Sequence, residues 1–520
     1  MSAEGSNIHG LYEPGYSSNL MEHEETTTSV LSKQSDPSSK PMPEQLPDPD
    51  LSAQPSGPSF VERLPLEILT EVFIHCLPHH HFRQPNKHEA PLLLAQVCTF
   101  WRHLTLDTPM LWASLEIFGK SELRLVDLWL SRSRRYPLSL SVQYDCFLLD
   151  YALNIVLNHS THLRHLKLYI PRSNCIFLSE DVHLPLLETF EMFTANSLEH
   201  YLVQSLSRCL TAAPRLKSFT WNNYILHHLP IELKWSNLTH LKLNMAISLQ
   251  DCVAIFSDAK VMTHIVLGFL LIGPSAVDFS VVLPQLQSLI VCAGDDPGPM
   301  FNAITVPKLK ELLINSRFWP HHPIREFLRR SACPLERLNL YYPPLDEAEF
   351  IECLEIVQHT LKEFTIHDVE QDDEEDDEQE ISAVITDNIL DRLMDTGEGD
   401  ILCPKIEIIA LYNCISCSPG RLADMAQSRL KPSNPIDAQD PSWLVFVGGG
   451  RALTLKTIET YDNEAERTFL VPLRSLGLIV KIYSATTGAE IEMEEDDIRL
   501  RDLFEEGLVT SSYEGYVEGP

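Results

Sequence analysis

A short pattern of apolar and polar positions recurs through the middle of the chain. Its form is Leu-x-x-Leu-x-Leu, with Phe, Ile, Met, Val or Trp replacing some leucines. The first residues of its copies are Leu163, Leu187, Leu216, Leu238, Met262, Leu286, Leu309, Leu335, Leu361 and Ile406. Eight of the nine steps between these positions are 22–29 residues long. Because alternating apolar and polar residues are typical of a half-buried strand, the pattern predicts a series of short strands at regular spacing.

Helix-like segments lie between the predicted strands. Ser197 to Leu210 and Asp346 to Val357 both carry apolar residues at helical spacing, and Asp346 is a good N-cap residue. A strand followed by a helix at this period is typical of a leucine-rich repeat. The predicted fold class of residues 137–430 is therefore α/β: a solenoid with parallel strands on its inner, concave side and helices outside.

The repeat is irregular. Eight positions after the first leucine, where this kind of repeat normally has Asn or Cys, only Cys414 fits. The one long step, of 45 residues, contains the acidic run Asp368 to Glu380, which we interpret as an insertion within one unit. The number of repeats and the curvature of the solenoid stay open on these grounds.

A different pattern precedes the repeats, at residues 61–115. Ile68, Leu69, Val72 and Phe73 share one helical face, and Pro65 suits the first turn of that helix. A polar loop from Pro78 to Pro91 follows. A second helix is predicted from Leu92 to about Thr105, and then come Pro109 and Leu111-Trp112. So small a module cannot hide all of these apolar side chains, which predicts that it docks on another protein.

The stretches LPLEILTEVF and APLLLAQVCTFWRHLTLDTPMLW resemble the F-box of fungal-type F-box proteins. In that family the loop between the first two helices is often long, and VCxxWR and PxLW elements recur. The resemblance covers about 55 residues. It implies docking to the Skp adaptor of a Skp–cullin–F-box ubiquitin ligase, and through that adaptor to a cullin scaffold.

By this resemblance eight residues are candidates for contact with the adaptor: Leu64, Pro65, Ile68, Leu69, Val72, Val97, Cys98 and Trp101. Large apolar residues serve in cores as well as in interfaces, so for each of them the alternative is the core of the module itself. A linking helix within 116–136, at Leu123 to Ser133, and a strand at Pro137 to Val142 are predicted to join the module to the repeats. The stretch LWLSRSRRYPLSLSV in this region is also similar to fungal F-box proteins.

The formal net charge of −33 is concentrated in three segments. Residues 1–60 carry −7, the run 368–380 carries −10 and residues 490–520 carry −9, which leaves −33 + 26 = −7 for the rest. We expect residues 1–60 to form a disordered Ser/Pro-rich tail, residues 368–380 a solvated loop and residues 490–520 an acidic tail. The alternative is that these acidic segments bind a basic partner. Residues 431–489 are interpreted as a closing cap, with strands near Leu453 to Leu455 and Leu473 to Leu478.

The same composition excludes several classes of partner. An acidic chain lacks the clustered Lys and Arg that nucleic acids and anionic membranes need. Its longest strongly apolar stretch, Ile265 to Gly273, is too short to span a bilayer, and its first thirty residues do not resemble a secretory signal. We therefore expect a protein of the cytoplasm, the nucleus or both, with twelve reduced cysteines.

No pattern in the sequence predicts catalysis, a cofactor or a metal site. Cys414 and Cys417 form a lone CxxC without a second pair at zinc-finger spacing. The histidines at 79–81 and 321–322 are expected in exposed polar loops. Gly448 to Gly450 lacks the Lys-Ser/Thr of a phosphate-binding loop.

Two functions remain. In the first, the chain is the substrate-recognition subunit of the ligase, and concave-face residues select a target protein. The candidates are Arg164, His165, Lys217, His240, Lys310, Glu311, Glu336, Arg337 and Lys362, and for each of them the alternative is an ordinary exposed residue. In the second, the chain is an acidic leucine-rich-repeat binder of basic proteins without a ligase role, and the F-box-like module is only an N-terminal cap. The sequence does not identify the target.

Overall fold

The computed structural model describes residues 64–79, 81–118, 123–143, 146–170, 182–194, 200–223, 231–272, 279–341, 344–367, 384–395, 400–430, 455–461, 470, 473 and 478–483. The chain divides into two units, Met1–Leu64 and Pro65–Pro520. Every helix and strand named below belongs to the second unit. The acidic segments 1–60, 368–380 and 490–520 lie outside the described residues.

A small helical module opens the second unit. It contains α1 (Leu66–His75), α2 (Leu94–Val97), α3 (Thr99–Asp107) and the 3₁₀ helix η2 (Pro109–Trp112). The prediction of one helix from Leu92 to Thr105 is wrong, because Cys98 is extended (φ −157°, ψ 171°) and separates α2 from α3. The Cys98 thiol accepts a hydrogen bond from the Trp101 amide at 3.4 Å, so Cys98 caps the new helix.

A single sheet of fourteen strands follows, with all neighbouring strands parallel. Its strands are β1 (Ser114–Phe118), β2 (Leu138–Gln143), β3 (Leu163–Ile170), β4 (Thr189–Thr194), β5 (Ser218–Asn222), β6 (His240–Ser248), β7 (His264–Leu271), β9 (Ser288–Ala293), β11 (Glu311–Ser316), β12 (Arg337–Tyr341), β13 (Glu363–His367), β14 (Ile408–Tyr412), β15 (Thr457–Tyr461) and β16 (Ile479–Tyr483). Two further strands, β8 (Val281–Val282) and β10 (Ile304–Thr305), form a separate pair.

Each of the ten predicted repeat positions contains one of these strands, which confirms a solenoid-like α/β fold with a large parallel sheet. The sheet begins at β1, before the predicted linking helix, and it continues past residue 430 through β15 and β16. The last two strands lie a few residues after the segments predicted for them, and they pair with the preceding strands as the repeats do.

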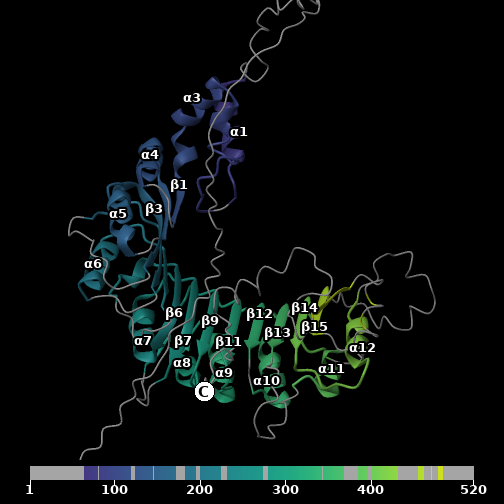
Figure 1. Cartoon of the computed structure of the whole chain (residues 1–520). Coiled ribbons are helices and arrows are strands. Elements are labelled where there is room, and N and C mark those ends of the chain that lie inside the picture. Colours follow the sequence, from purple (N-terminus) through teal and green to yellow (C-terminus); the bar gives the residue numbers. More distant parts are fainter. Residues whose placement is uncertain are drawn as a thin grey trace, which may run out of the picture. The chain divides into compact units, whose positions relative to one another are not determined.

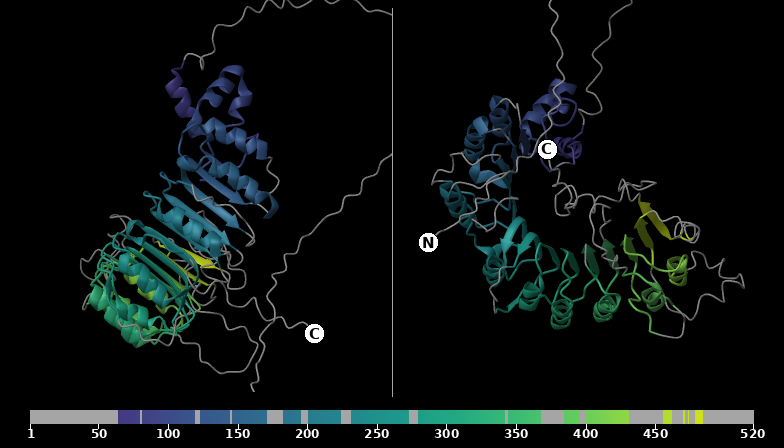
Figure 2. Two further views of the ribbon diagram at one scale, coloured as in Figure 1. Left: turned by 90° about the vertical axis from the view of Figure 1, so that its left-hand side faces the viewer. Right: turned by 60° about the horizontal axis from the view of Figure 1, so that its bottom comes forward.

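Helices lie on one face of the sheet (Figures 1 and 2). They are α4 (Leu123–Ser133), α5 (Cys146–Leu157), α6 (His200–Thr211), α7 (Leu249–Asp258), α8 (Gly298–Ala303), α9 (His321–Ser331), α10 (Glu347–Val357), α11 (Asp387–Leu393) and α12 (Arg421–Ser428), with 3₁₀ turns η3 (Ser160–His162) and η4 (Trp235–Asn237). Asp346 caps α10 as predicted, since its carboxylate accepts from the amides of Ala348 and Glu349. We call the opposite face of the sheet the strand face.

The repeated leucines build the core between sheet and helices. Residues at the fourth position of the pattern are in register across the sheet and at most 4% exposed: Leu140, Leu166, Phe190, Phe219, Leu241, Ile265, Leu289, Leu312, Leu338, Phe364 and Ile409. Burial of each such side chain contributes about 1.5–3 kcal/mol. Because strand side chains alternate, the fifth-position residue between two buried ones lies on the strand face.

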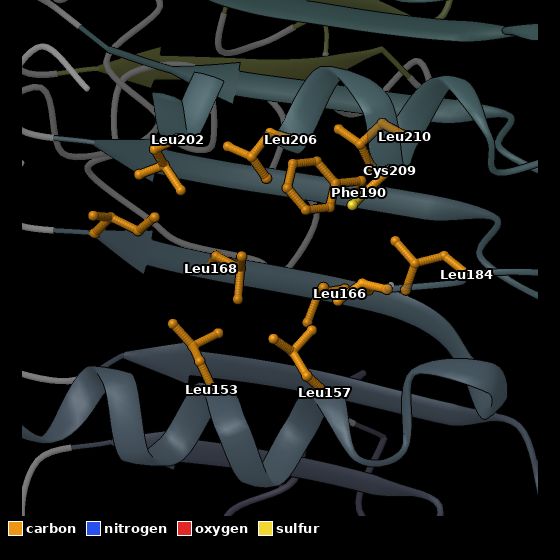
Figure 3. Close-up of a pocket in the computed structure, with 12 residues that line it drawn as sticks. Leu153, Leu157, Leu166, Leu168, Leu184, Phe190, Leu202, Leu206, Cys209 and Leu210 are labelled. Atoms are coloured by element: carbon orange, nitrogen blue, oxygen red, sulfur yellow. The ribbon is translucent and has the colours of Figure 1, made fainter. Parts of the chain in front are cut away.

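Packing between the first helices leaves a small apolar cavity of about 20 Å³ (Figure 3). Leu153 and Leu157 of α5 and Leu202 and Leu206 of α6 point into it across β3 and β4. A cavity that offers only apolar side chains holds no ordered water and no polar ligand. We therefore regard it as a packing defect of the core.

Candidate functional site

The helical module has a closed core of its own. Leu69 and Phe73 of α1 are at most 1% exposed, and the Phe73 ring lies 4.8 Å from the Trp101 ring between centroids. Leu94 of α2 is also buried. The module therefore folds around part of the apolar stripe that the sequence shows.

A second set of large apolar side chains in the module stays at the surface. Leu66, Ile68 and Val72 of α1, with Leu93 and Val97 at α2, are between 45 and 56% exposed. Ile68 and Val72 are one helical turn apart and so share a side of α1, as Leu93 and Val97 share a side of α2. We call these five residues the α1–α2 apolar surface. A group of exposed aliphatic side chains on a small module is a candidate site for contact with another protein.

The eight residues assigned to adaptor contact by resemblance fall into two groups. Pro65, Ile68, Val72, Val97 and Cys98 are exposed, and Leu64 is partly exposed. Leu69 belongs to the core, and Trp101 is partly buried against Phe73. At Leu69 the burial supports the alternative of a core residue. One helix thus presents one apolar stripe inward and the neighbouring stripe outward.

The module is joined to the sheet through Trp112. This side chain is fully buried, and its indole N–H donates to the Thr105 carbonyl at 2.8 Å. The Trp129 ring of α4 packs edge-on against it at 4.7 Å, and the Arg132 guanidinium lies 4.5 Å above its centroid. The predicted linking helix α4 is therefore packed onto the module and not only connected to it.

The loop between α1 and α2 is also packed. His81 contacts His165 of β3, with ring centroids 4.7 Å apart, and the Arg83 carbonyl accepts from the Glu116 amide of β1 at 2.7 Å. Burial, with smaller contributions from His81 and Arg164, lowers the pKa of His165 to about 4. His79 is exposed as predicted, whereas His80 lies outside the described residues.

Most residues proposed to select a target take part in contacts within the chain. Arg164 pairs with Glu188, Glu336 lies between Lys310 and Lys362, and Arg337 pairs with Glu311, at N–O distances of 2.7–3.7 Å. A hydrogen bond from Lys362 is the main cause that lowers the pKa of Glu336. These ion pairs are partly exposed, so each contributes only about 0–1 kcal/mol to stability.

The remaining two residues of that group differ from each other. Lys217 is exposed and has no ion pair among the described residues. His240 of β6 stacks on His264 of β7, with centroids 4.4 Å apart and ring planes 6° from parallel. His264 was not among the residues predicted from the sequence, although Thr-His recurs at 239–240 and 263–264, one repeat period apart.

The cysteines of the repeats are structural. The Cys414 thiol lies 3.8 Å from the Ile366 carbonyl of the neighbouring repeat, which agrees with its predicted place in the pattern. In the repeat that starts at Leu216, Asn223 lies one residue before the position where such repeats normally have Asn or Cys. It is fully buried, and its side-chain amide donates to the Thr194 hydroxyl at 2.5 Å. Burial raises the pKa of Cys292 and Cys353 to about 12, so neither thiol is a nucleophile at neutral pH.

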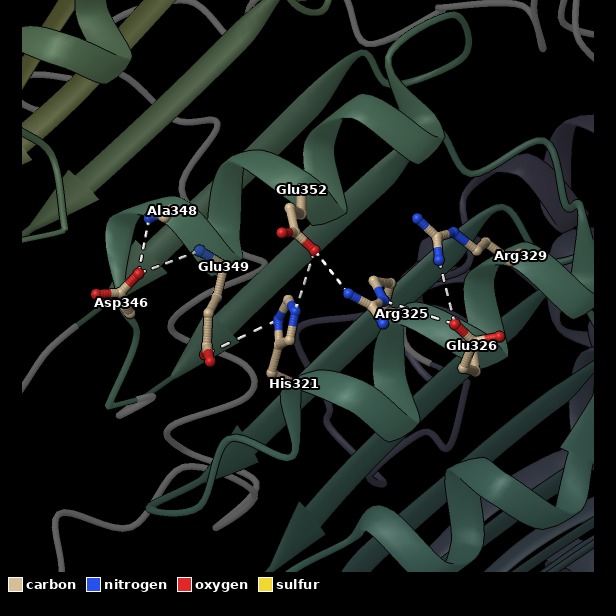
Figure 4. A network of polar contacts seen from close by, with 8 residues as sticks. All are labelled: His321, Arg325, Glu326, Arg329, Asp346, Ala348, Glu349 and Glu352. Carbon is tan, nitrogen blue, oxygen red and sulfur yellow. Dashed lines mark hydrogen bonds and ion pairs between the residues drawn. The ribbon is translucent and has the colours of Figure 1, made fainter.

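A polar network joins α9 and α10 on the helical face (Figure 4). His321 contacts Glu349 and Glu352, and the Arg325 guanidinium pairs with Glu352 at 2.9 Å. Arg329 reaches Glu326 on the same helix. His321 is therefore not a free loop histidine, and the charges of this network are satisfied by neighbouring helices.

Two kinds of feature are absent from the described part of the chain. No group of three or more His, Cys, Asp or Glu residues there could hold a metal ion. No helix among the described residues has the length and apolar character needed to cross a membrane. No family model matches the chain, and no curated protein matches it.

Proposed function

We propose that the chain is the substrate-recognition subunit of a Skp–cullin–F-box ubiquitin ligase. The helical module would dock on the Skp adaptor, and the sheet would hold a target protein. The observation that carries this proposal is the α1–α2 apolar surface, five large aliphatic side chains exposed on a module that already has a core. The resemblance of 61–115 to an F-box supplies the identity of the partner.

The junction at Trp112 supports the same function. A ligase receptor acts by proximity: it raises the effective concentration of target lysines near the conjugating enzyme and makes no bond itself. Such a mechanism needs a fixed distance between the two docking sites. Packing of Trp112 between Trp129 and Arg132 restricts movement of the module relative to the first strands.

Capture of a purified Skp adaptor by the full-length chain tests the proposal. We expect Ile68→Asp and Val72→Asp to abolish capture, because each places a charge in the apolar interface. Leu125→Asp is the matched control, since Leu125 of α4 is equally exposed but outside the α1–α2 apolar surface. Thermal melts should be unchanged in all three variants.

Two outcomes would contradict the proposal. If the wild-type chain captures no adaptor, the ligase role fails. If Ile68→Asp and Leu125→Asp reduce capture equally, the α1–α2 apolar surface is not the docking site.

A further inference from the structure

The fifth-position residues of the strand face change character in the middle of the sheet. On the earlier strands they are Glu116, Ser141, Lys167, Glu191, Thr220 and Lys242, and on the later ones Asn339, Thr365, Ala410, Glu459 and Lys481. Between them Val266, Ile290 and Leu313 are in register on β7, β9 and β11. Val266 and Ile290 are partly exposed, whereas Leu313 is buried. We call the two partly exposed residues, Val266 and Ile290, the central strip.

Phe269 extends the central strip at the C-terminal end of β7. Its side chain is 45% exposed. A Cβ built on Gly294 of the neighbouring strand would lie only 2.3 Å from the Phe269 ring, so the ring rests directly on the Gly294 backbone. Any larger residue at 294 would displace it. Gly294 therefore leaves the space in which the exposed Phe269 ring packs against the backbone.

Two acidic residues follow Gly294 in the chain. They are Asp295 and Asp296, and both are exposed. The Asp295 carboxylate accepts from the Ile272 amide at 3.2 Å, and the Asp296 carboxylate accepts from the Gly298 amide at 2.8 Å. These bonds fix both side chains at the C-terminal ends of β7 and β9, and each carboxylate keeps capacity for further donors.

Two histidines, His240 and His264, lie at the N-terminal ends of β6 and β7. The Thr239 hydroxyl donates to the Lys217 carbonyl and the Thr263 hydroxyl to the Thr239 carbonyl. The Nδ1 atoms of His240 and His264 lie 2.9 Å from these hydroxyls. Burial and the neighbouring His264 lower the pKa of His240, so its ring is neutral at neutral pH and offers one nitrogen as an acceptor.

We propose that the central strip binds an extended target segment in which an apolar side chain is flanked by Lys or Arg. The apolar side chain would cover Val266 and Ile290. One basic side chain would lie on the exposed Phe269 ring beside Asp295 and Asp296, where a cation gains from both the ring and the carboxylates. A second N–H donor would meet the neutral ring of His240, which offers an acceptor nitrogen. An acidic segment would face these same groups with repulsion.

This inference names the target class of the proposed receptor and so rests on the proposed function. It is tested on the isolated full-length chain with three labelled peptides of equal length, by fluorescence polarisation. In the first peptide Leu alternates with Arg, in the second Leu alternates with Glu, and in the third Ser alternates with Arg. Adaptor capture is measured separately on the same preparation.

We expect only the Leu–Arg peptide to bind. Phe269→Ala should weaken its binding about tenfold, and the double variant Asp295→Asn, Asp296→Asn should do the same while its amide oxygens keep the backbone hydrogen bonds. Phe118→Ala is the matched control, because Phe118 is a similarly exposed aromatic on the strand face at β1. It should leave binding unchanged.

Equal binding of the Leu–Glu peptide, equal loss in Phe118→Ala, or no binding of any peptide would overturn the inference. Adaptor capture separates this failure from a failure of the proposed function. A chain that captures the adaptor but ignores the Leu–Arg peptide is a receptor for another kind of target.

Discussion

The helical module and the parallel sheet bury their apolar side chains to different extents. In the sheet, every repeat brings a strand and a connecting segment, and the fourth-position leucines are buried between the two layers. In the module, α1 carries two neighbouring apolar stripes, and only the one with Leu69 and Phe73 is covered. Each repeat buries its apolar side chains against the next repeat. A short helical module has no neighbouring repeat to cover its second apolar stripe.

The difference teaches where to look for binding. Exposed aliphatic residues have little meaning when single, but a set on one helix or one strip of a sheet lowers solubility unless a partner covers it. By that criterion we propose two binding surfaces, the α1–α2 apolar surface and the central strip. The charged residues beside them on the strand face are largely paired with each other.

The largest expected effect comes from separating the two regions. Trp112→Ala removes a fully buried indole, its hydrogen bond to Thr105 and its contacts with Trp129 and Arg132. We expect a loss of about 3–5 kcal/mol in the free energy of unfolding, measured by denaturant titration. Phe118→Ala replaces an exposed aromatic side chain, so it should lower the free energy of unfolding only slightly. A loss below that of Phe118→Ala would mean that module and sheet are not packed together.

A second prediction compares neighbouring residues of α1. Leu69→Ala should cost about 2–5 kcal/mol of stability, because it leaves a cavity in the module core. Ile68→Ala should cost within about 0.5 kcal/mol, since its side chain is exposed, and should instead weaken adaptor capture. Denaturant titration and capture are measured on both variants. Equal stability losses would contradict the division of α1 into an inner and an outer stripe.

The smallest effect concerns the loop that packs on β3. The pKa of His165 is lowered from 6.5 to about 4, so between these values the unfolded chain binds more protons than the folded one. Its contribution to stability is complete above pH 6.5 and is lost as the pH falls toward 4. His81→Ala removes a neighbour that excludes water and repels the proton, so the pKa of His165 should rise toward 6.5.

Titration of the histidine ring signals by NMR checks this expectation. His79→Ala, an exposed residue of the same loop, is the control and should leave the His165 titration in place. An unchanged midpoint in His81→Ala would show that the loop does not cover β3 in solution.

The strands were predictable because each is specified locally. Leu163, Leu166 and Leu168 mark β3 by spacing alone, and the same spacing marks β4 to β7, β9 and β11 to β14. Cys414 was placed correctly for the same reason. The break at Cys98 was not, since a cysteine cap gives no periodic signal and Val97, Cys98 and Trp101 fit a single helical face.

The candidate sites were predicted only in part. The resemblance of 61–115 drew attention to α1, but spacing could not tell Leu69, in the core, from Ile68, at the surface. Charged residues such as Arg164 and Glu336 were proposed as target contacts from their position in the repeat. Their partners, Glu188 on one side and Lys310 and Lys362 on the other, come from adjacent repeats in space.

The sequence by itself determined the repeating strands, the α/β class and the apolar character of the N-terminal module, because these follow from periodicities of a few residues. Only the tertiary structure decided which apolar stripe of α1 faces water, that His81 lies on His165, and that Val266, Ile290 and Phe269 form one strip. These features join residues 20 or more positions apart, and their separation is set by the register of neighbouring strands. Long-range register is a product of packing, which no local pattern encodes.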